Sequence, residues 1–448
     1  MDITETSLWE DVQDVLDSGP NAVHYAYRCS IDNGEEQIDP RQITLIDVDR
    51  NYLTQYGDQT TITVRLSRRD YERKIYPNKE DLYITLTKEP LGETSDDEDF
   101  DQEVITRRYR AVLAENRSSL LEQSTANAAD ESVMDTEPDY EYTFQLIDPA
   151  LEILRTKSTG GIFTDMTTTG VVQGLMTQLA NDLDLEEDSN VQGVDVVEGT
   201  NNRTYTHIVL PHGVRYTQIP ETIQELYGLY SSGLGVYYQT GVWYVFPAYN
   251  VKRFDQVPDP VTIINVPPRR LHGIERTYLQ DDQSLIILST GQVVHDDQSE
   301  VAQMNVGTGV RYAKSENIME GFHSVEENKA TVTKSENIRE YSVHDRSSKQ
   351  AMALFSPARI TDNVDRESSR LAEGLGFVVK LIWDNANPDL VYPGQPVKFA
   401  YMDEGSLSEI YGTILGADHA ITPTSTAMSQ RRFQTRVELT LFLEKPEA

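Results

Sequence analysis

The sequence is poor in cysteine and has no long apolar run. Its one cysteine, Cys29, cannot form an intrachain disulfide, and a thiolate metal cluster needs more than one. No window approaches the roughly 18 consecutive apolar residues of a membrane-spanning helix, and Met1 to Glu5 lack the basic and apolar regions of a signal peptide. We therefore expect a protein that is made in the cytoplasm and has no membrane span of its own.

Basic side chains are also scarce. The chain has 39 Lys and Arg against 73 Asp and Glu, which gives a formal net charge of -34. Such a charge repels a phosphate backbone over most of the surface and disfavours specific binding of nucleic acid. Two interpretations stay open: a solvated acidic surface that favours solubility, or a wall past which nucleic acid slides without binding.

Common catalytic and cofactor-binding motifs are absent from the sequence. There is no Walker loop, no dinucleotide-binding glycine fingerprint and no zinc-type cluster of Cys and His. Ser231 and Ser232 precede Gly233, but the glycine two residues before the serine of a nucleophile elbow is missing, so a loop is predicted. His207 and His212 are five residues apart across a proline, a spacing typical of a strand and a turn rather than of a helical metal pair. We expect no enzyme activity, no cofactor and no metal ion.

One segment partly matches a calcium-binding loop. Asp47, Asp49 and Asn51 fit positions 1, 3 and 5 of such a loop. However, Tyr52 occupies the position of the glycine that makes the sharp bend, and Asp58 replaces the bidentate glutamate. The pattern favours a polar turn between two strands over a calcium site.

The fold class predicted from periodicity is α+β and mainly β. Residues 1–147 are predicted to form a first antiparallel β-barrel, which follows a short amphipathic helix over 3–17 and carries polar loops at 93–99 and 123–138. Its strands are β-branched and aromatic runs with a period of two, separated by Gly, Asn, Asp or Pro. The predicted strands are 23–28, 43–46, 61–66, 82–86, 104–113 and 140–147.

Residues 148–259 are predicted to form an α+β domain. Apolar residues at helical spacing predict a helix over 167–183, and Pro220 favours the start of a second one over 221–229. Strands are predicted at 205–210, 235–239 and 242–246, with Thr240 and Gly241 as a hairpin turn. The six tyrosines in this region are interpreted as core and interface residues rather than as a stacking platform for bases, because Lys and Arg are sparse around them: Tyr227, Tyr230, Tyr237, Tyr238, Tyr244 and Tyr249.

A second β-barrel is predicted from residues 260–290 together with 371–448. An arm over 291–370 splits it, and the arm is predicted to be extended and poor in core contacts because it holds few large apolar residues. Lys314 to Ile318 recurs as Lys334 to Ile338, which is one repeat and too few for a solenoid. The strands of this barrel are predicted at 261–264, 285–288, 376–383, 397–401, 411–415 and 435–443.

Three stretches, taken in order, resemble baseplate central hub proteins of contractile-tailed phages, which are similar to the hub portion of type VI secretion spike proteins. The first is the strand pattern that ends in residues 74–86. The second runs from Phe144 to Pro149, through the helix that ends at Leu183 and on to residues 219–247. The third is residues 387–397 with the strands after it. The resemblance spans most of the chain, but the acidic loops and the repeat-bearing arm depart from it.

This resemblance implies a structural virion protein. It implies a homotrimer that joins a sixfold tail tube to a threefold central spike, contacts other baseplate proteins and forms part of the DNA conduit without binding nucleic acid specifically. It also implies synthesis in the host cytoplasm and assembly into the phage tail. Two other functions stay open: a tail-associated peptidoglycan hydrolase, since many carboxylates are present, and an acidic β-rich adhesion protein.

Overall fold

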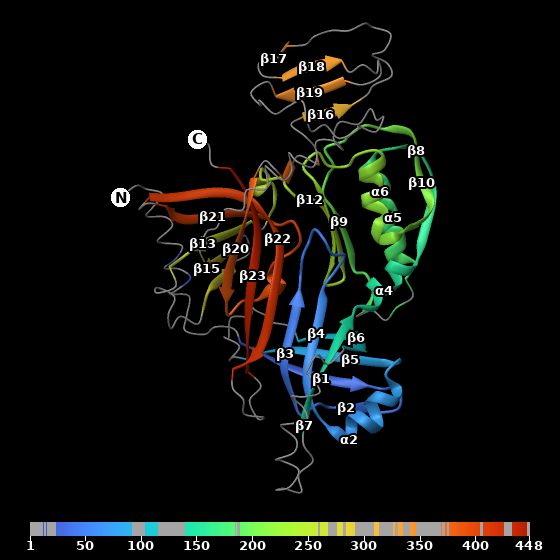
Figure 1. Cartoon of the computed structure of the whole chain (residues 1–448), viewed down its shortest axis with the longest axis vertical. Coiled ribbons are helices and arrows are strands. Elements are labelled where there is room, and N and C mark those ends of the chain that lie inside the picture. Colours follow the sequence, from blue (N-terminus) through green and yellow to red (C-terminus); the bar gives the residue numbers. More distant parts are fainter. Residues whose placement is uncertain are drawn as a thin grey trace.

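A computed structural model describes most of the chain (Figure 1). The described residues are 24–91, 104–114, 139–183, 189–258, 260–267, 276–280, 284–291, 376–403, 406–424 and 432–445, short strands between 309 and 345, and a few single positions. The predicted helix over 3–17, apart from Val12 and Val15, lies outside these residues, and so do the acidic loops and most of the arm. Of the repeated segments in the arm, Lys334 alone is described. Among the described residues, no helix combines the length and the apolarity needed to cross a membrane.

The chain is mainly β, as the sequence predicts, and its largest unit is a mixed sheet of fourteen strands. Alternation explains why these segments are strands. In β4, for example, Ile62, Val64 and Leu66 point into the core while Thr61 and Thr63 face outward. The first strands of this sheet are β1 (His24–Asp32), β2 (Gln37–Ile38), β3 (Gln42–Asp49), β4 (Gln59–Ser67), β5 (Leu82–Leu91), β6 (Ile105–Leu113) and β7 (Asp139–Ile147). A short helical segment between β4 and β5 consists of α2 (Arg68–Asp70), η1 (Tyr71–Ile75) and η2 (Tyr76–Asn78).

The remaining strands of the large sheet come from the second half of the chain. They are β13 (Val261–Asn265), β14 (Tyr278–Gln280), β15 (Leu285–Ser289), β20 (Gly376–Asp384), β21 (Pro396–Asp403), β22 (Ser406–Pro423) and β23 (Arg432–Glu444). The short helix η9 (Pro388–Leu390) precedes β21. The pairing that the sequence predicts between the C-terminal strands and residues 261–264 is present, because β13 lies parallel to both β15 and β21.

The strand pairings close two circuits that share β22 and β23. One circuit runs β22, β3, β4, β7, β6, β5, β1, β23 and back to β22. The other runs β22, β21, β13, β15, then through the bridge between Thr290 and Ile382 to β20, and through β23 back to β22. The first circuit is therefore completed by C-terminal strands, which the sequence assigns to the second unit alone. The division into two superimposable barrels remains a prediction.

The two circuits enclose separate apolar cores. One contains Ile62, Val64 and Phe144 with Ile421 and Phe433 from the C-terminal hairpin. The other contains side chains from β13, β15 and β20 to β23, together with Tyr52 and residues of the middle region. Figure 1 shows the long strands β22 and β23 reaching from the second circuit down to β1 and β3 of the first.

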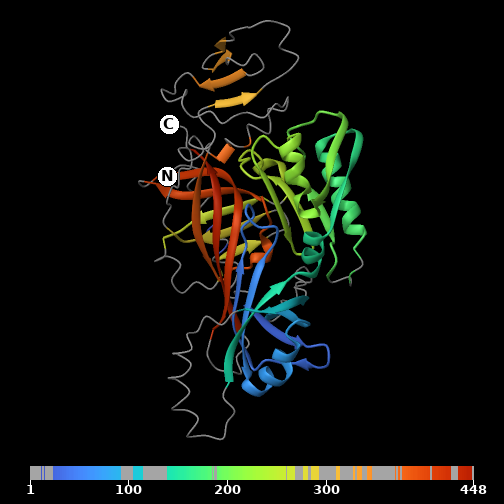
Figure 2. The ribbon, with the colours of Figure 1, turned by 45° about the vertical axis from the view of Figure 1, so that its right-hand side comes forward.

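The middle region is layered, with helices between two small sheets (Figure 2). Its helices are α4 (Pro149–Thr156), α5 (Thr168–Asn181) and α6 (Ile219–Leu226), with η4 (Tyr216–Gln218) before α6 and η5 (Phe254–Gln256) after the strands. A two-stranded ribbon of β8 (Ser158–Met166) and β10 (Tyr205–Arg215) lies on one side, and β9 (Gly193–Val196), β11 (Leu234–Gln239) and β12 (Val242–Pro247) form a sheet on the other. Both predicted helices are present, and the hairpin turn at Thr240 and Gly241 has positive φ at both residues, as a type I′ turn requires.

The sequence did not predict α4 or β8. Asp148 caps α4 with hydrogen bonds of 2.9 and 3.2 Å from the amides of Ala150 and Leu151, and Pro149 occupies the first helical turn. The second predicted helix begins at Ile219 and ends at Leu226, so it starts before Pro220 rather than after it.

Most of the described residues of the arm form strands. Four antiparallel strands form a separate sheet in the order β16 (Gly309–Tyr312), β19 (Tyr341–Asp345), β18 (Ala330–Lys334) and β17 (Glu326–Glu327). Cross-strand backbone hydrogen bonds thus organise part of a segment that was predicted to be extended. Of the repeated pentapeptides, Lys334 ends β18, and residues 314–318 and 335–338 lie outside the described residues.

Candidate functional site

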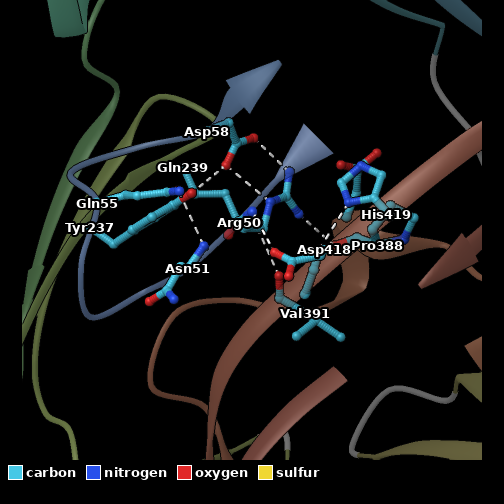
Figure 3. Close-up of polar contacts among 12 residues, drawn as sticks. Arg50, Asn51, Gln55, Asp58, Tyr237, Gln239, Pro388, Val391, Asp418 and His419 are labelled. Atoms are coloured by element: carbon cyan, nitrogen blue, oxygen red, sulfur yellow. Dashed lines mark hydrogen bonds and ion pairs between the residues drawn. The ribbon is translucent and has the colours of Figure 1, made fainter. Parts of the chain in front are cut away.

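The loop between β3 and β4 lies where the two strand circuits and the middle region meet. This loop, residues 50–58, is the segment that partly matches a calcium loop. Oδ1 of Asn51 accepts hydrogen bonds of 3.1 Å from the amides of both Leu53 and Thr54, so the asparagine stabilises the turn from within. We call the residues that this loop brings together the junction cluster: Arg50, Asp58, Tyr237, Gln239, Pro388, Val391, Asp418 and His419 (Figure 3).

Arg50 is the central charge of the junction cluster. Its side chain is only 3% exposed, and it forms a two-pronged ion pair with Asp58, through Nε to Oδ1 at 3.0 Å and Nη2 to Oδ2 at 2.7 Å. Nη1 donates to the carbonyl of Pro388 at 3.1 Å. Burial alone would lower the pKa of Arg50, but the adjacent Asp58 outweighs it and raises that pKa. The guanidinium is therefore a permanent buried cation whose donors have partners in two distant segments.

The backbone of Arg50 is bound to β22. Its N–H donates to Oδ1 of Asp418 at 2.8 Å, and its carbonyl accepts from the amide of Ala417 at 3.0 Å. Gly416 lies beside this contact, at a point where the register between β22 and β23 shifts. A Cβ at Gly416 would lie 3.1 Å from the Arg50 carbonyl oxygen, so the absent side chain permits the close approach.

The same loop is bound to the middle region. The Tyr237 hydroxyl donates to Oδ1 of Asp58 at 2.9 Å, and the Tyr237 ring packs edge to face on Tyr52, with 4.9 Å between ring centroids. Gly57 forms a parallel bridge with Tyr238, whose amide donates to the carbonyl of Tyr56 at 2.9 Å. Asp58 is thus shared between a side chain of the loop and a side chain of β11.

The middle region also contacts the C-terminal segment directly. Nε2 of Gln239 donates to the carbonyl of Val391 at 2.7 Å, and Nη1 of Arg253 donates to the carbonyl of Gly394 at 3.1 Å. These bonds satisfy backbone carbonyls between η9 and β21, which form no strand ladder there. The loop at 50–58, the middle region and the C-terminal segment are therefore each joined to the other two around Arg50.

A second ion pair, with a buried lysine, joins β5 to η9. Nζ of Lys88 lies 2.6 Å from Oδ2 of Asp389 and 2.9 Å from Oδ1 of Asn387, and it lies over the Tyr25 ring, 4.0 Å from the ring centroid. Burial alone would raise the pKa of Asp389, but Lys88, followed by Arg107 and Arg50, outweighs burial and lowers that pKa. Asp389 is consequently charged at pH 7.

His419 is buried in β22 next to this network. Its Nδ1 lies 3.0 Å from the carbonyl of Ala417, and its side chain packs on the interior side of the strand. Burial, and then the positive charge of Arg50, lower the pKa of His419 to about 4. The imidazole is therefore neutral at pH 7.

The residues singled out in the sequence are not brought together in one site. Asp58 binds the Arg50 guanidinium, so the last position of the candidate calcium loop is occupied by a protein cation. His207 and His212 are exposed on β10, and Ser231 and Ser232 precede a tight turn in which Gly233 has a φ of 81°. Among the described residues, no three His, Cys, Asp or Glu side chains are arranged to hold a metal ion.

The tyrosine interpretation is confirmed for the residues at the centre of the group. Tyr230, Tyr237 and Tyr238 are buried, which places them in the core and not on a surface where bases could stack. Burial raises the pKa of each of their hydroxyls.

Arginines in the basic stretches 65–69 and 107–110 pair with acids of the same chain. Arg65 binds Glu141 at 3.0 Å and Arg108 binds Asp32 at 3.2 Å, while Arg110 pairs with Glu152. The acids come from other strands of the sheet or from α4, and the sequence could not show that they lie close to these arginines.

Arg50, Lys88 and Asp389 were missed by sequence reasoning. A charged residue at the end of a strand is usually solvated, and the partners of Arg50 include residues more than 300 positions away. The only local signal was Asn51 followed by Gly57. This pattern predicts a tight polar turn but does not show which distant residues contact it.

Comparison with known proteins gives a likeness of fold and no close relative. No protein-family model and no curated protein matches the sequence. A tail protein from Neisseria meningitidis MC58 has a TM-score of 0.46 and 13% identity, over 93% of this chain and 96% of that one. A 43 kDa tail protein of prophage MuSo2 from Shewanella oneidensis has a TM-score of 0.47 and 11% identity, over 92% and 98% of the two chains. An E. coli component of the type VI secretion system has a TM-score of 0.33 and 9% identity, over 91% and 74%.

The solved structures similar to this chain are phage tail and baseplate proteins and proteins related to type VI spikes. These are the classes of protein that the sequence resembles.

Proposed function

We propose that the chain is a structural, non-enzymatic baseplate hub of a phage-type contractile injection machine. As a homotrimer it would join a sixfold tail tube on one side to a threefold spike on the other, contact other baseplate proteins and surround part of the DNA path. The proposal rests on the ordered resemblance in sequence and on how the described strands are connected.

The observation that carries the proposal is the sharing of β22 and β23 by both strand circuits. Two β-rich units that share a hairpin behave as one body, because the hairpin cannot move in one unit without moving in the other. Three chains in a ring would then present six β units toward a sixfold partner and a threefold face toward the other. A hub that matches two symmetries needs such a doubled unit in each chain.

The junction cluster supports the same role. Arg50 and Asp58 join the loop of the first circuit to β11, to η9 and to β22, so the middle region is held to both circuits. A subunit that transmits force between a tube and a spike needs fixed angles between its parts. Buried, geometrically matched ion pairs provide such angular specificity even where they add little to stability.

The conduit role is supported by charge. Asp47 and Asp49 are exposed on β3, and the half-buried Asp418 lies on the same face of the neighbouring β22. Partial burial is the main cause that raises the pKa of Asp47, and repulsion from the nearby carboxylate of Asp49 adds to it. A wall of this charge would give DNA no counterion release on contact and would let it pass.

Electron microscopy of the purified protein tests the proposal. End-on averages should show rings with threefold symmetry and six β-rich lobes. Rings of another symmetry, or lobes in any number other than six, would contradict it. A zymogram on bacterial cell wall tests the enzymatic alternative, and we expect no clearing.

A further inference from the structure

A short helical segment lies at one end of the first strand circuit. We call residues 68–79, which contain α2, η1 and η2, the helical segment; it lies near β2 in Figure 1. Nδ2 of Asn33, the residue after β1, donates to the carbonyl of Lys74 at 2.9 Å. Because the last residue of β1 pairs with Tyr83, the helical segment lies at the Leu82 end of β5.

The surface of the helical segment combines aromatic and basic side chains. The Tyr71 ring stacks on Tyr142 of β7, with 3.8 Å between ring centroids, and Tyr76 lies against Tyr71 at 6.0 Å. Tyr76 is 53% exposed, and the Lys79 ammonium lies 5.2 Å from the centroid of its ring. A tyrosine that is held by ring contacts and still open to solvent is the kind of rigid anchor that is enriched in protein interfaces.

Two arginines of the helical segment have charges that the chain does not neutralise by a close ion pair. Arg69 and Arg73 are exposed, and neither forms a salt bridge with a residue that the structure describes. Glu72 and Asp70 are already bound to other basic residues of the segment, at 2.8 and 3.3 Å. Residues 80–81 are acidic but belong to the turn that leads into β5. Like charges four residues apart on a helix repel each other, so a carboxylate partner would stabilise this pair.

The chemistry that fits this surface occurs elsewhere in the same chain. Residues 92–103 contain seven acidic side chains, no basic one and Phe100. The other polar stretch, residues 123–138, has only four acids in sixteen positions. The first stretch therefore has the higher density of carboxylates for the two arginines, and it also has an aromatic ring that can pack on Tyr76.

Residues 92–103 cannot reach the helical segment of their own chain. In the register of β5 and β6, Lys88 pairs with Ile105, so the stretch leaves and returns at the Leu91 end of β5. The ten residues of β5 span about 30 Å, whereas twelve residues that go out and return extend at most about 20 Å. The helical segment lies at the opposite end of β5, so these carboxylates meet it only when they come from another copy.

We propose that the helical segment docks residues 92–103 of a second copy of this chain, an inference that rests on the homotrimer proposed above. Arg69 and Arg73 bind carboxylates of that stretch, and Tyr76 packs on its aromatic ring. The two patches are different and lie at opposite ends of β5, so the contact is heterologous, and three such contacts around a threefold axis close a ring. The acidic stretch then holds neighbouring copies together.

Charge reversal in the full-length protein tests this contact. Arg69→Glu with Arg73→Glu places carboxylates opposite the acids of residues 92–103, and both side chains are exposed, so the fold should be retained. The matched control is Arg155→Glu with Arg215→Glu, which makes the same change in charge at two exposed arginines of the middle region. Analytical ultracentrifugation should show that the first variant needs at least a tenfold higher concentration to form trimers, with thermal unfolding unchanged. The control should assemble like the wild type.

A second pair of reversals identifies the occupant. Adding Asp97→Arg and Asp99→Arg to the first variant restores opposite charges, and we expect trimers at the wild-type concentration. Normal assembly of Arg69→Glu with Arg73→Glu, beside a trimeric wild type, would overturn the docking surface and leave the hub function standing. Weakened assembly that the second pair does not restore would overturn the acidic stretch as the occupant. A wild-type protein that forms no oligomer would contradict both the docking surface and the hub.

Discussion

The backbone N–H of Arg50 donates a 2.8 Å hydrogen bond to Oδ1 of Asp418, which lies 368 residues further along the chain. The side chain of Arg50 is at the same time bound to Asp58. One residue of the first strand circuit thus fixes a loop against the hairpin that both circuits share. If the two circuits form one body, substitutions here should affect the whole chain rather than one domain.

Replacing Arg50 should lower the free energy of unfolding. Arg50→Met removes a buried charge and leaves Asp58 without its cation, so we expect a loss of about 3–5 kcal/mol of unfolding free energy. The matched control is Arg65→Met, which breaks the exposed pair with Glu141 and should cost about 0–1 kcal/mol. Urea unfolding followed by tryptophan fluorescence measures both. Equal costs for the two variants would show that Arg50 does not hold the junction.

The shared hairpin should not tolerate a side chain at Gly412. A Cβ there would lie 2.1 Å from the carbonyl oxygen of Phe442 on β23, a backbone atom that cannot rotate away. We expect Gly412→Ala to lower the melting temperature strongly and to separate β22 from β23 locally. Gly174→Ala is the control: it lies on an exposed face of α5 with nothing within 4 Å, and should gain about 0.5–1 kcal/mol. Tolerance of Gly412→Ala would argue against the close pairing of the two strands.

Because of His419, the free energy of unfolding should depend on pH at values above the pKa of ordinary carboxylates. Its pKa is lowered from 6.5 to about 4, so the unfolded chain takes up a proton as the pH falls below 6.5 while the folded chain does not. This contribution to stability is present above pH 6.5 and is lost as the pH falls toward 4. At about 1.4 kcal/mol for each pH unit, the slope between pH 6 and 5 should be clear in urea unfolding. His419→Gln should flatten the slope in that window, and an unchanged slope would show that other groups cause it.

The protein should not bind duplex DNA at physiological salt. The net charge of -34 disfavours phosphate contacts, and Arg65 and Arg108 already bind carboxylates of this chain. Gel-shift titration at about 150 mM salt measures this. The dissociation constant should be weaker than the micromolar values that are usual for proteins that bind DNA nonspecifically. Tight binding that weakens steeply with added salt would contradict the conduit role.

Local sequence patterns predicted the elements well where one face of an element is buried. The period of two in β4 and the helical spacing in α5 were both visible, because packing on a core selects apolar residues at regular positions. The strand at 411–415 was predicted too short: β22 extends from Ser406 to Pro423, since a strand that is shared between two circuits continues where its alternation weakens.

The junction cluster could not be predicted in the same way. Arg50 of this cluster contacts Pro388, and outside the cluster Lys88 contacts Asp389. No local pattern encodes a partner about 300 residues away. The intrachain pairing of Arg65 with Glu141 depends on the register between β4 and β7. The sequence alone does not show which strands pair or in which register.

The number of chains in the assembled particle tests the central claim most directly. Native mass spectrometry of the purified full-length protein over a range of concentrations should show a particle of three chains. This result is predicted because two β-rich circuits in each chain supply six units only when three chains join. A particle that remains a monomer, or that assembles into two, four or six chains, would contradict the account.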